Sequence, residues 1–347
     1  LYPGLIAASS SLGLTEISAV RPSNDYREIG AHNARLLAYR AINPDSELIP
    51  VVRQNGVTHA QVVPNGELVR GRSGVVRTEG WTWADRLELG PNALHLTWPS
   101  MRLDRSDDAE PMKDQLRVRS EKLAVLDEVV ERAKSYAASE GIDRNLELEA
   151  WGAVVSREMS VFVHANGERE IRAAVEWADR HELDLVITGG TEAWRVGELL
   201  AEHDVPVVLE RVMSLPSRDS DHVWSGFRRA ASLHELGVKL VISLAPGPFG
   251  DSQARNVAFH AGMAHAHGLP EDAALASVTL NAAEVIGVGD RLGSLEPGKQ
   301  ATLVAVRGNL LEITDPVERV WIAGREVSLE NRHTRLYERY RNRPGPE

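Results

Sequence analysis

The sequence predicts a (β/α)8 barrel of the TIM type, in the α/β class. Short apolar runs of strand length alternate with longer amphipathic patterns of helical period. Two such pairs are Val161 to Ala165 before Arg169 to His181, and Leu183 to Gly189 before Thr191 to Glu202. Because parallel strands need a crossover connection, this regular alternation indicates a parallel sheet. In such a barrel, functional side chains are expected at the C-terminal ends of the strands.

The first third of the chain predicts a strand, helix, strand step. A strand within residues 1–12 is followed by expected helices at Ala31 to Asn43 and at Ser46 to Gln54. Gly56 to Val63 then has the composition of the next strand. This order is typical of a βαβ unit.

Residues Asn65 to Pro91 contain turn residues and alternating apolar positions, which predict a hairpin excursion. We expect its Trp81 and Trp83 to cover a pocket. Ala93 to Trp98 alternates with period two, which places His95 on the opposite face from its apolar neighbours.

The rest of the chain continues the pattern. Glu110 to Ala138 predicts a long solvent-facing helix, whereas Leu146 to Trp151 is ambiguous. The remaining expected elements are strands at Pro206 to Leu209 and Lys239 to Leu244, helices at Ser252 to His267 and Glu271 to Val278, and a hairpin at Val320 to Val327.

Composition excludes several classes of function. The net charge of −11 over 347 residues argues against a nucleic-acid-binding surface, which needs clustered Lys and Arg. No apolar run approaches the length of a membrane span, so we expect a soluble chain with no membrane partner. The absence of cysteine excludes disulfides and leaves the compartment open between cytoplasmic and periplasmic or secreted.

Three local motifs resemble those of a known enzyme family. The start Pro3-Gly4-Leu5-Ile6 resembles the first barrel strand of the amidohydrolase superfamily, best its imidazolonepropionase-like branch. In that family a histidine-any-histidine pair follows and binds a divalent metal, but Ser9 and Ser11 stand at those two positions. Val161 to Ala165 resembles the fifth-strand motif and keeps its histidine as His164.

The two remaining positions of this motif set are also substituted. By the same resemblance, Gly189 stands where the sixth strand carries a histidine, and Ala245 where the last strand leads to the catalytic aspartate. One ligand position of five is therefore retained. A structural zinc site is worth roughly 10 to 16 kcal/mol from about four ligands, so one histidine supplies roughly 3 to 4 kcal/mol. That corresponds to an affinity of about millimolar or weaker.

The resemblance implies a metal-dependent hydrolase of cyclic amide C–N bonds, whereas the substitutions predict a metal-deficient and catalytically impaired relative. We expect it to retain a pocket for a small molecule or a partner chain, with no cofactor. The alternative is an active hydrolase of non-peptide C–N bonds with a rearranged site and zinc, using His164, His95, Asp251 or residues upstream of Leu1. Asp251 also fits a helix N-cap, and His164 fits a hydrogen-bonded barrel histidine. The sequence selects no homo-oligomer or hetero-oligomer surface.

We expect the pocket at the C-terminal ends of the strands, around Ser9, Ser11, His95, His164, Gly189 and Ala245. The expected domains are a barrel over 1–290, strands of a small β-sandwich over 291–330 and a charged tail over 331–347. The resemblance implies that the strands Ala301 to Val306 and Arg319 to Ile322 pair with strands upstream of Leu1, because sheets rarely leave edges exposed.

Overall fold

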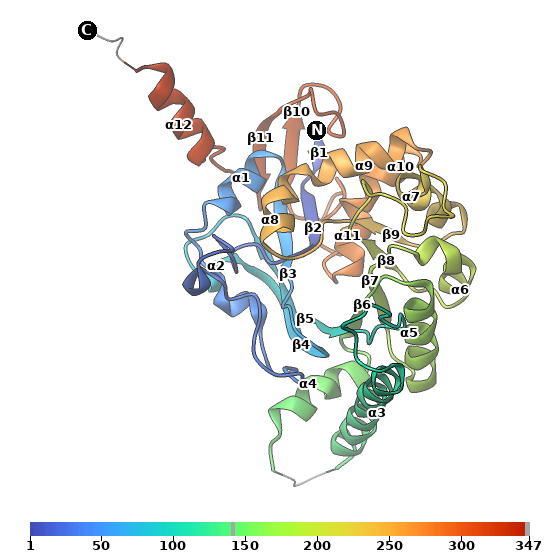
Figure 1. The fold of residues 1–347 in the computed structure, drawn as a ribbon. Coiled ribbons are helices and arrows are strands. Elements are labelled where there is room, and N and C mark those ends of the chain that lie inside the picture. Colours follow the sequence, from blue (N-terminus) through green and yellow to red (C-terminus); the bar gives the residue numbers. More distant parts are fainter. Residues whose placement is uncertain (140–142, 344–347) are drawn as a thin grey trace.

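The computed structural model describes residues 1–139 and 143–343, which form two sheets surrounded by helices (Figure 1). The larger sheet has eight strands in the order β2 to β9. These strands are β2 (Leu5–Ser10), β3 (Val57–Val62), β4 (Val69–Arg77), β5 (Leu87–Thr97), β6 (Ser160–Ala165), β7 (Leu185–Gly189), β8 (Val207–Leu209) and β9 (Leu240–Ile242). The predicted barrel is confirmed, with one strand reversed.

Strand β4 runs against its two neighbours. It pairs antiparallel with both β3 and β5, whereas the other neighbouring pairs of the large sheet are parallel. Because β3 and β5 flank a strand of opposite direction, their own C-terminal ends still lie at one edge of the sheet. The reversal therefore leaves the remaining strand ends gathered at one end of the barrel.

The barrel is nearly closed between β9 and β2, where the described residues form no strand ladder. Ser243, just after β9, bridges the two strands through its side chain. Its Oγ accepts from the Ser9 amide (3.1 Å) and donates to the Ser9 carbonyl (3.3 Å). Helix α11 (Leu280–Val285) contacts both strands and covers this seam.

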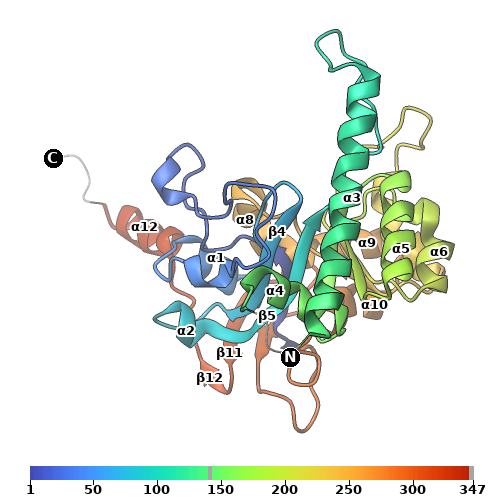
Figure 2. The same cartoon turned by 90° about the horizontal axis from the view of Figure 1, so that it is seen from below.

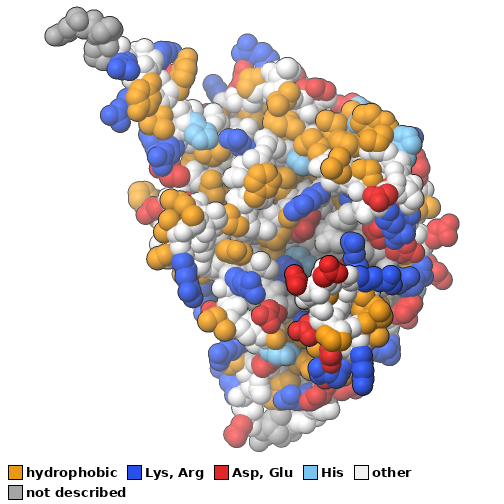
Figure 3. Space-filling model, viewed as in Figure 1, with side chains coloured by type: hydrophobic (Ala, Val, Ile, Leu, Met, Phe, Trp, Pro, Cys, Tyr) orange, Lys and Arg blue, Asp and Glu red, His pale blue; other side chains and the backbone are white. Residues whose placement is uncertain are grey.

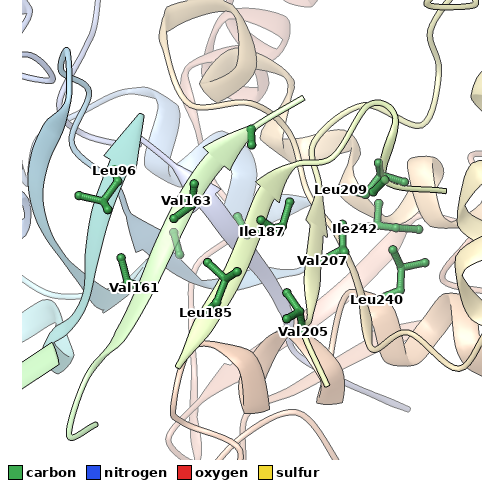
Figure 4. Close-up of a cluster of buried hydrophobic side chains, with 14 of the residues drawn as sticks. Leu96, Val161, Val163, Leu185, Ile187, Val205, Val207, Leu209, Leu240 and Ile242 are labelled. Carbon is green, nitrogen blue, oxygen red and sulfur yellow. The ribbon is translucent and has the colours of Figure 1, made fainter. Parts of the chain in front are cut away.

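Period-two alternation sorts the strand residues into an inner and an outer layer. The inner layer includes Ile6, Phe162 and Val241, which pack with one another inside the barrel. The outer layer faces the helices, and its labelled members in Figure 4 run across β5 to β9. Both layers are almost wholly buried, so the apolar strand runs noted in the sequence reflect burial on both faces.

Helices cover the outside of the barrel in the order expected for crossover connections (Figure 2). Helix α3 is the longest and extends beyond the body of the barrel in that view. The helices are α1 (Leu48–Gln54), α2 (Trp83–Arg86), α3 (Met112–Ala137), α4 (Leu146–Val155), α5 (Glu168–His181), α6 (Gly197–Glu202), α7 (Ser225–Glu235), α8 (Pro248–Gln253), α9 (Val257–Ala266), α10 (Glu271–Ser277), α11 and α12 (Arg332–Arg341).

The helix expected over Ala31 to Asn43 is wrong. This segment is an extended loop with one short 3-10 turn, Ala38–Ala41. The Asn33 amide donates to the Val69 carbonyl (2.9 Å) and the Arg72 amide to the Leu36 carbonyl (2.8 Å). Because β4 satisfies these backbone groups, the segment does not need its own helical hydrogen bonds.

The expectation that Trp81 and Trp83 cover a pocket is also wrong. Since β4 is antiparallel, it carries the chain back to the N-terminal ends of the other strands, where Arg77 pairs with His59. Both tryptophans follow this point and lie at the opposite end from the predicted pocket. Trp81 is 89% exposed, and Trp83 packs against Tyr39 with ring centroids 6.1 Å apart.

The smaller sheet has the order β1 (Tyr2–Pro3), β10 (Leu303–Val306), β11 (Val317–Ile322) and β12 (Arg325–Glu326). Each inner strand has a neighbour on either side within the described residues, but β1 pairs with β10, and β12 with β11, over two residues each. Pairing with strands upstream of Leu1 stays a prediction. The predicted hairpin is confirmed, and its turn at Ala323 and Gly324 has positive φ at both residues (49° and 78°). The domain boundaries at 290 and 330 stay predictions.

The surface carries charges of both signs. Figure 3 shows acidic and basic side chains interspersed over the face that it draws. Within the described ranges, no helix is both long and apolar enough to cross a membrane.

Candidate functional site

A cavity of about 370 Å³ opens at the C-terminal ends of the barrel strands. Its walls come from β4 to β7 and from the segments that follow β3, β5, β6, β8 and β9. The lining residues are Asn65, Arg70, Thr97, Trp98, Ser100, His164, Asn166, Glu170, Thr188, Glu210, Ala245 and Pro246. Of the six residues predicted for a pocket, His164 and Ala245 line this cavity.

The two serines at the end of β2 lie beneath the cavity and are buried. Ser9 Oγ donates to Glu210 Oε1 (2.8 Å), and Ser11 Oγ donates to Asp251 Oδ2 (2.5 Å). The register of β2 on β3 shifts between Ala7 and Ser10. Both hydroxyls are therefore engaged with carboxylates from distant parts of the chain.

Asp251 does not cap a helix, so that expectation is wrong. It is the fourth residue of α8, whose N-cap is Gly247, and its carboxylate turns inward to the serines. Ser10 Oγ and the Ser11 amide each donate to its Oδ1 at 2.8 Å. Burial raises the pKa of this carboxyl to about 6, although the serine hydrogen bonds act to lower it.

His95 and His164 lie side by side on β5 and β6. His95 Nδ1 and His164 Nε2 are 3.1 Å apart, and the other nitrogen of His95 lies 2.8 Å from Ser73 Oγ. Burial first, and then the positive charge of Arg70, lower the pKa of both rings well below the usual range. Both imidazoles are thus neutral near pH 7.

Gly189 does not reach the cavity wall, which corrects its place among the predicted pocket residues. Its φ is +97°, and a Cβ there would lie 2.8 Å from Asn166 Oδ1. Thr188, the strand partner of His164 in the β6–β7 ladder, lines the cavity instead.

Glu210 and Arg70 are among the cavity residues that the sequence interpretation missed. Glu210 directly follows β8, and the rule that functional groups follow barrel strands could have found it. Its pKa is raised by burial, against the lowering effects of the Ser9 hydrogen bond and of Arg70. Arg70 could not be placed from the sequence, because its position depends on the reversal of β4.

Arg70 brings a positive charge to the cavity. Its Nε donates to Thr97 Oγ1 (2.7 Å), and Thr97 Oγ1 donates in turn to the Gly66 carbonyl (3.1 Å). Burial lowers the pKa of the guanidinium only to about 10, so it stays charged near pH 7. The side chain is therefore a fixed cation on the cavity wall.

These donors do not fit a divalent metal. His164 Nδ1 and Glu210 Oε1 are 4.0 Å apart, but the guanidinium of Arg70 shares their cavity. Both nitrogens of His95 are engaged with His164 and Ser73. Among the residues the structure describes, no group of three or more His, Asp or Glu side chains could hold a metal ion.

The fold and the arrangement of strand ends agree with a comparison to known families. Residues 91–327 match the model of the amidohydrolase family. The chain belongs to the amidohydrolase family. The resemblance seen in the sequence is confirmed at the level of the superfamily, and the family is one of hydrolases.

Two curated amidohydrolase-family relatives are similar to this chain in sequence. Amidohydrolase tasK of Hapsidospora irregularis is 23% identical over 93% of the chain, which spans only 36% of that relative's length. A 5-methylthioadenosine/S-adenosylhomocysteine deaminase of Teredinibacter turnerae is 39% identical over 16% of the chain and 16% of its own length.

A solved amidohydrolase from Thermotoga maritima shares the fold. It superposes with a TM-score of 0.79 at 24% identity, over 94% of this chain and 86% of the other.

Proposed function

We propose that this amidohydrolase-family chain binds a small molecule in its barrel-end cavity without a bound metal and has lost metal-dependent hydrolysis. One observation carries the proposal. Ser9 and Ser11, which the motif places at the family's metal-binding histidines, donate their hydroxyls to Glu210 and Asp251 (2.8 and 2.5 Å). The hydroxyls are neutral, and each is engaged with a carboxylate.

Electrostatics supports the same proposal. A divalent cation beside His164 would share the cavity with the guanidinium of Arg70. Charges of like sign repel, and this repulsion opposes the roughly 3 to 4 kcal/mol that one ligand of a four-ligand site contributes. Net metal affinity from His164 is expected to be negligible.

The cavity itself supports ligand binding. Its volume of about 370 Å³ lies within the range of small-molecule sites, and its walls combine a cation, an imidazole and a carboxyl with amide side chains. Strand ends hold these groups, so little reorganisation is needed when a ligand enters. A partner chain is the less favoured occupant, because the cavity is small.

Elemental analysis of the purified protein tests the absence of metal. After dialysis against a metal-buffered solution, zinc, manganese and iron are each expected well below one equivalent per chain, for the wild type and for His164→Ala alike. His203→Ala, which replaces an exposed histidine outside the cavity, is the control and should have the same metal content as the wild type. One firmly bound metal per wild-type chain that is lost only in His164→Ala would overturn the proposal.

A second candidate is metal-independent hydrolysis of a C–N bond by Glu210 and His164. These side chains lie 4.0 Å apart on the cavity wall, where burial favours a protonated carboxyl beside an unprotonated imidazole. Such a pair has the protonation states that acid–base catalysis needs. Hydrolysis of a cyclic amide that resists chelators and is abolished by Glu210→Gln would support it, whereas no turnover by metal-free protein would reject it.

A further inference from the structure

Hydrogen bonds beneath the cavity determine which nitrogen of His95 carries the proton. Asn92 Nδ2 donates to the Ile286 carbonyl (3.0 Å), which turns Asn92 Oδ1 toward Ser73. Ser73 Oγ donates its one proton to that oxygen (2.8 Å) and can only accept from its other neighbours. His95 Nε2, 2.8 Å from Ser73 Oγ, is therefore the protonated nitrogen and donates.

The same reasoning fixes His164. A neutral imidazole has one donor and one acceptor nitrogen, so His95 Nδ1 accepts from its neighbour at 3.1 Å, His164 Nε2. His164 Nε2 therefore carries the proton, and His164 Nδ1 keeps its lone pair. Since Nδ1 lies on the side of Glu210, which shares the cavity wall, this acceptor faces the cavity.

Arg70 presents donors to the same cavity. Its Nε donates a hydrogen bond to Thr97 Oγ1. Thr97 is the strand partner of His164 in the β5–β6 ladder. Among the described residues, neither Nη nitrogen of Arg70 has a hydrogen-bond acceptor in range. The cavity therefore offers a cationic donor pair close to a neutral acceptor, each held in place by a strand.

We propose that the cavity takes a small carboxylate that carries an N–H or O–H donor near its acid group, as an N-acylamino acid does. The acid group is held by the Nη nitrogens of Arg70, and the donor by Nδ1 of His164. This inference rests on the proposed metal-free binding function and names its ligand class.

Competing ligand classes fit less well. A cationic ligand would be repelled by Arg70, and an apolar ligand would leave the Arg70 donors and the His164 acceptor without partners, which weakens its binding. Burial raises the pKa of the neighbouring Glu210, which reduces the opposition of its carboxyl to an anion. Glu170, the second carboxyl on the wall, accepts hydrogen bonds from the Met101 and Gly167 amides. Bidentate pairing with a carboxylate is the interaction for which a guanidinium is best suited.

Calorimetric titration with N-acetylglycine and its neutral analogue N-acetylglycinamide tests the proposal. Protein is first treated with a chelator and its metal content is measured. We expect one saturable site for the anion, with binding at least tenfold weaker for the amide. Arg70→Gln should weaken the anion at least tenfold without affecting the amide, whereas exposed Arg307→Gln should change neither. Equal binding of both probes, or no effect of Arg70→Gln, would overturn the inference.

Nitrogen NMR gives a readout that does not depend on the probe. The Nδ1 signal of His164 is expected to be of the unprotonated type and the Nε2 signal of the protonated type, with N-acetylglycine perturbing Nδ1 first. A protonated Nδ1 in folded wild-type protein would overturn the inference. If anion binding instead requires added metal, the proposed metal-free function is what fails, so the two failures are distinguishable.

Discussion

Ser11 Oγ donates to Asp251 Oδ2 at 2.5 Å, across 240 residues of sequence. Ser11 Oγ also accepts a hydrogen bond from the Gly247 amide at 2.7 Å. The start of the barrel is thereby tied to the loop that follows its last strand. At a position that the family motif assigns to a metal ligand, this chain has a buried structural contact.

Ser11→Ala is expected to destabilise the protein by about 1–3 kcal/mol, because it removes the buried hydrogen bonds that Ser11 Oγ makes to Asp251 Oδ2 and with the Gly247 amide. Urea unfolding followed by circular dichroism measures the change. The control is Ser252→Ala, a half-buried serine on the same helix as Asp251 whose hydroxyl donates only to the nearby Phe249 carbonyl, and its effect should be smaller than that of Ser11→Ala. Equal effects of the two substitutions would contradict the structural role of Ser11.

Asp251 should make stability depend on pH between about 4 and 6. Its pKa rises from an ordinary 3.8 to about 6 on folding, so the folded state holds the proton more tightly. The free energy of unfolding should therefore increase as pH falls from about 6 to about 4, by at most about 3 kcal/mol from this group.

The difference between wild type and Asp251→Asn isolates this contribution from that of Glu210. Urea unfolding at several pH values measures the free energy of unfolding of both proteins. As pH falls through this window, this free energy should increase more for the wild type than for Asp251→Asn. The exposed Asp107→Asn should follow the wild-type profile. A constant difference between wild type and Asp251→Asn across the window would refute the assignment.

Gly189→Ala should lower the free energy of unfolding by more than the strain of its positive φ angle alone. Gly298 has nearly the same φ (+98° against +97°), but open space surrounds it. A Cβ at Gly189 would lie 2.8 Å from Asn166 Oδ1 and 3.2 Å from the Ala165 carbonyl. We expect about 1 kcal/mol for Gly298→Ala and about 1–3 kcal/mol more for Gly189→Ala. Equal losses of stability for Gly189→Ala and Gly298→Ala in thermal unfolding would show that a Cβ near Asn166 is tolerated.

Glu210→Gln should leave the fold stable at pH 7, or slightly more stable. Glutamine can still accept the Ser9 hydrogen bond, and the variant no longer has a buried group whose ionised form is disfavoured. Ser9→Ala is the matched comparison, since it removes the donor and leaves the carboxyl unpaired, at about 1–3 kcal/mol. A larger loss of melting temperature in Glu210→Gln than in Ser9→Ala would contradict this account.

The amino-acid sequence determined the barrel, because its signals are local. The period of apolar residues over Val161 to Ala165 or Arg169 to His181 depends on neighbours a few residues away, and the structure has strand and helix there. The substituted motif positions Ser9, Ser11 and Ala245 are equally visible from the chain alone. The segment Ala31 to Asn43 misled the prediction, since its hydrogen-bond partners lie on β4.

Only the tertiary structure decided what surrounds the substituted positions. Glu210 accepts a hydrogen bond from Ser9, 201 residues away in the sequence. Asp251, which the sequence predicts as a helix cap, instead accepts hydrogen bonds from two serines. Arg70 enters the cavity because β4 runs opposite to its neighbours, a direction that no local pattern specifies. Such pairings follow from barrel closure, which packs distant strand ends together. This packing selects the neighbours of each side chain, and local backbone preference does not.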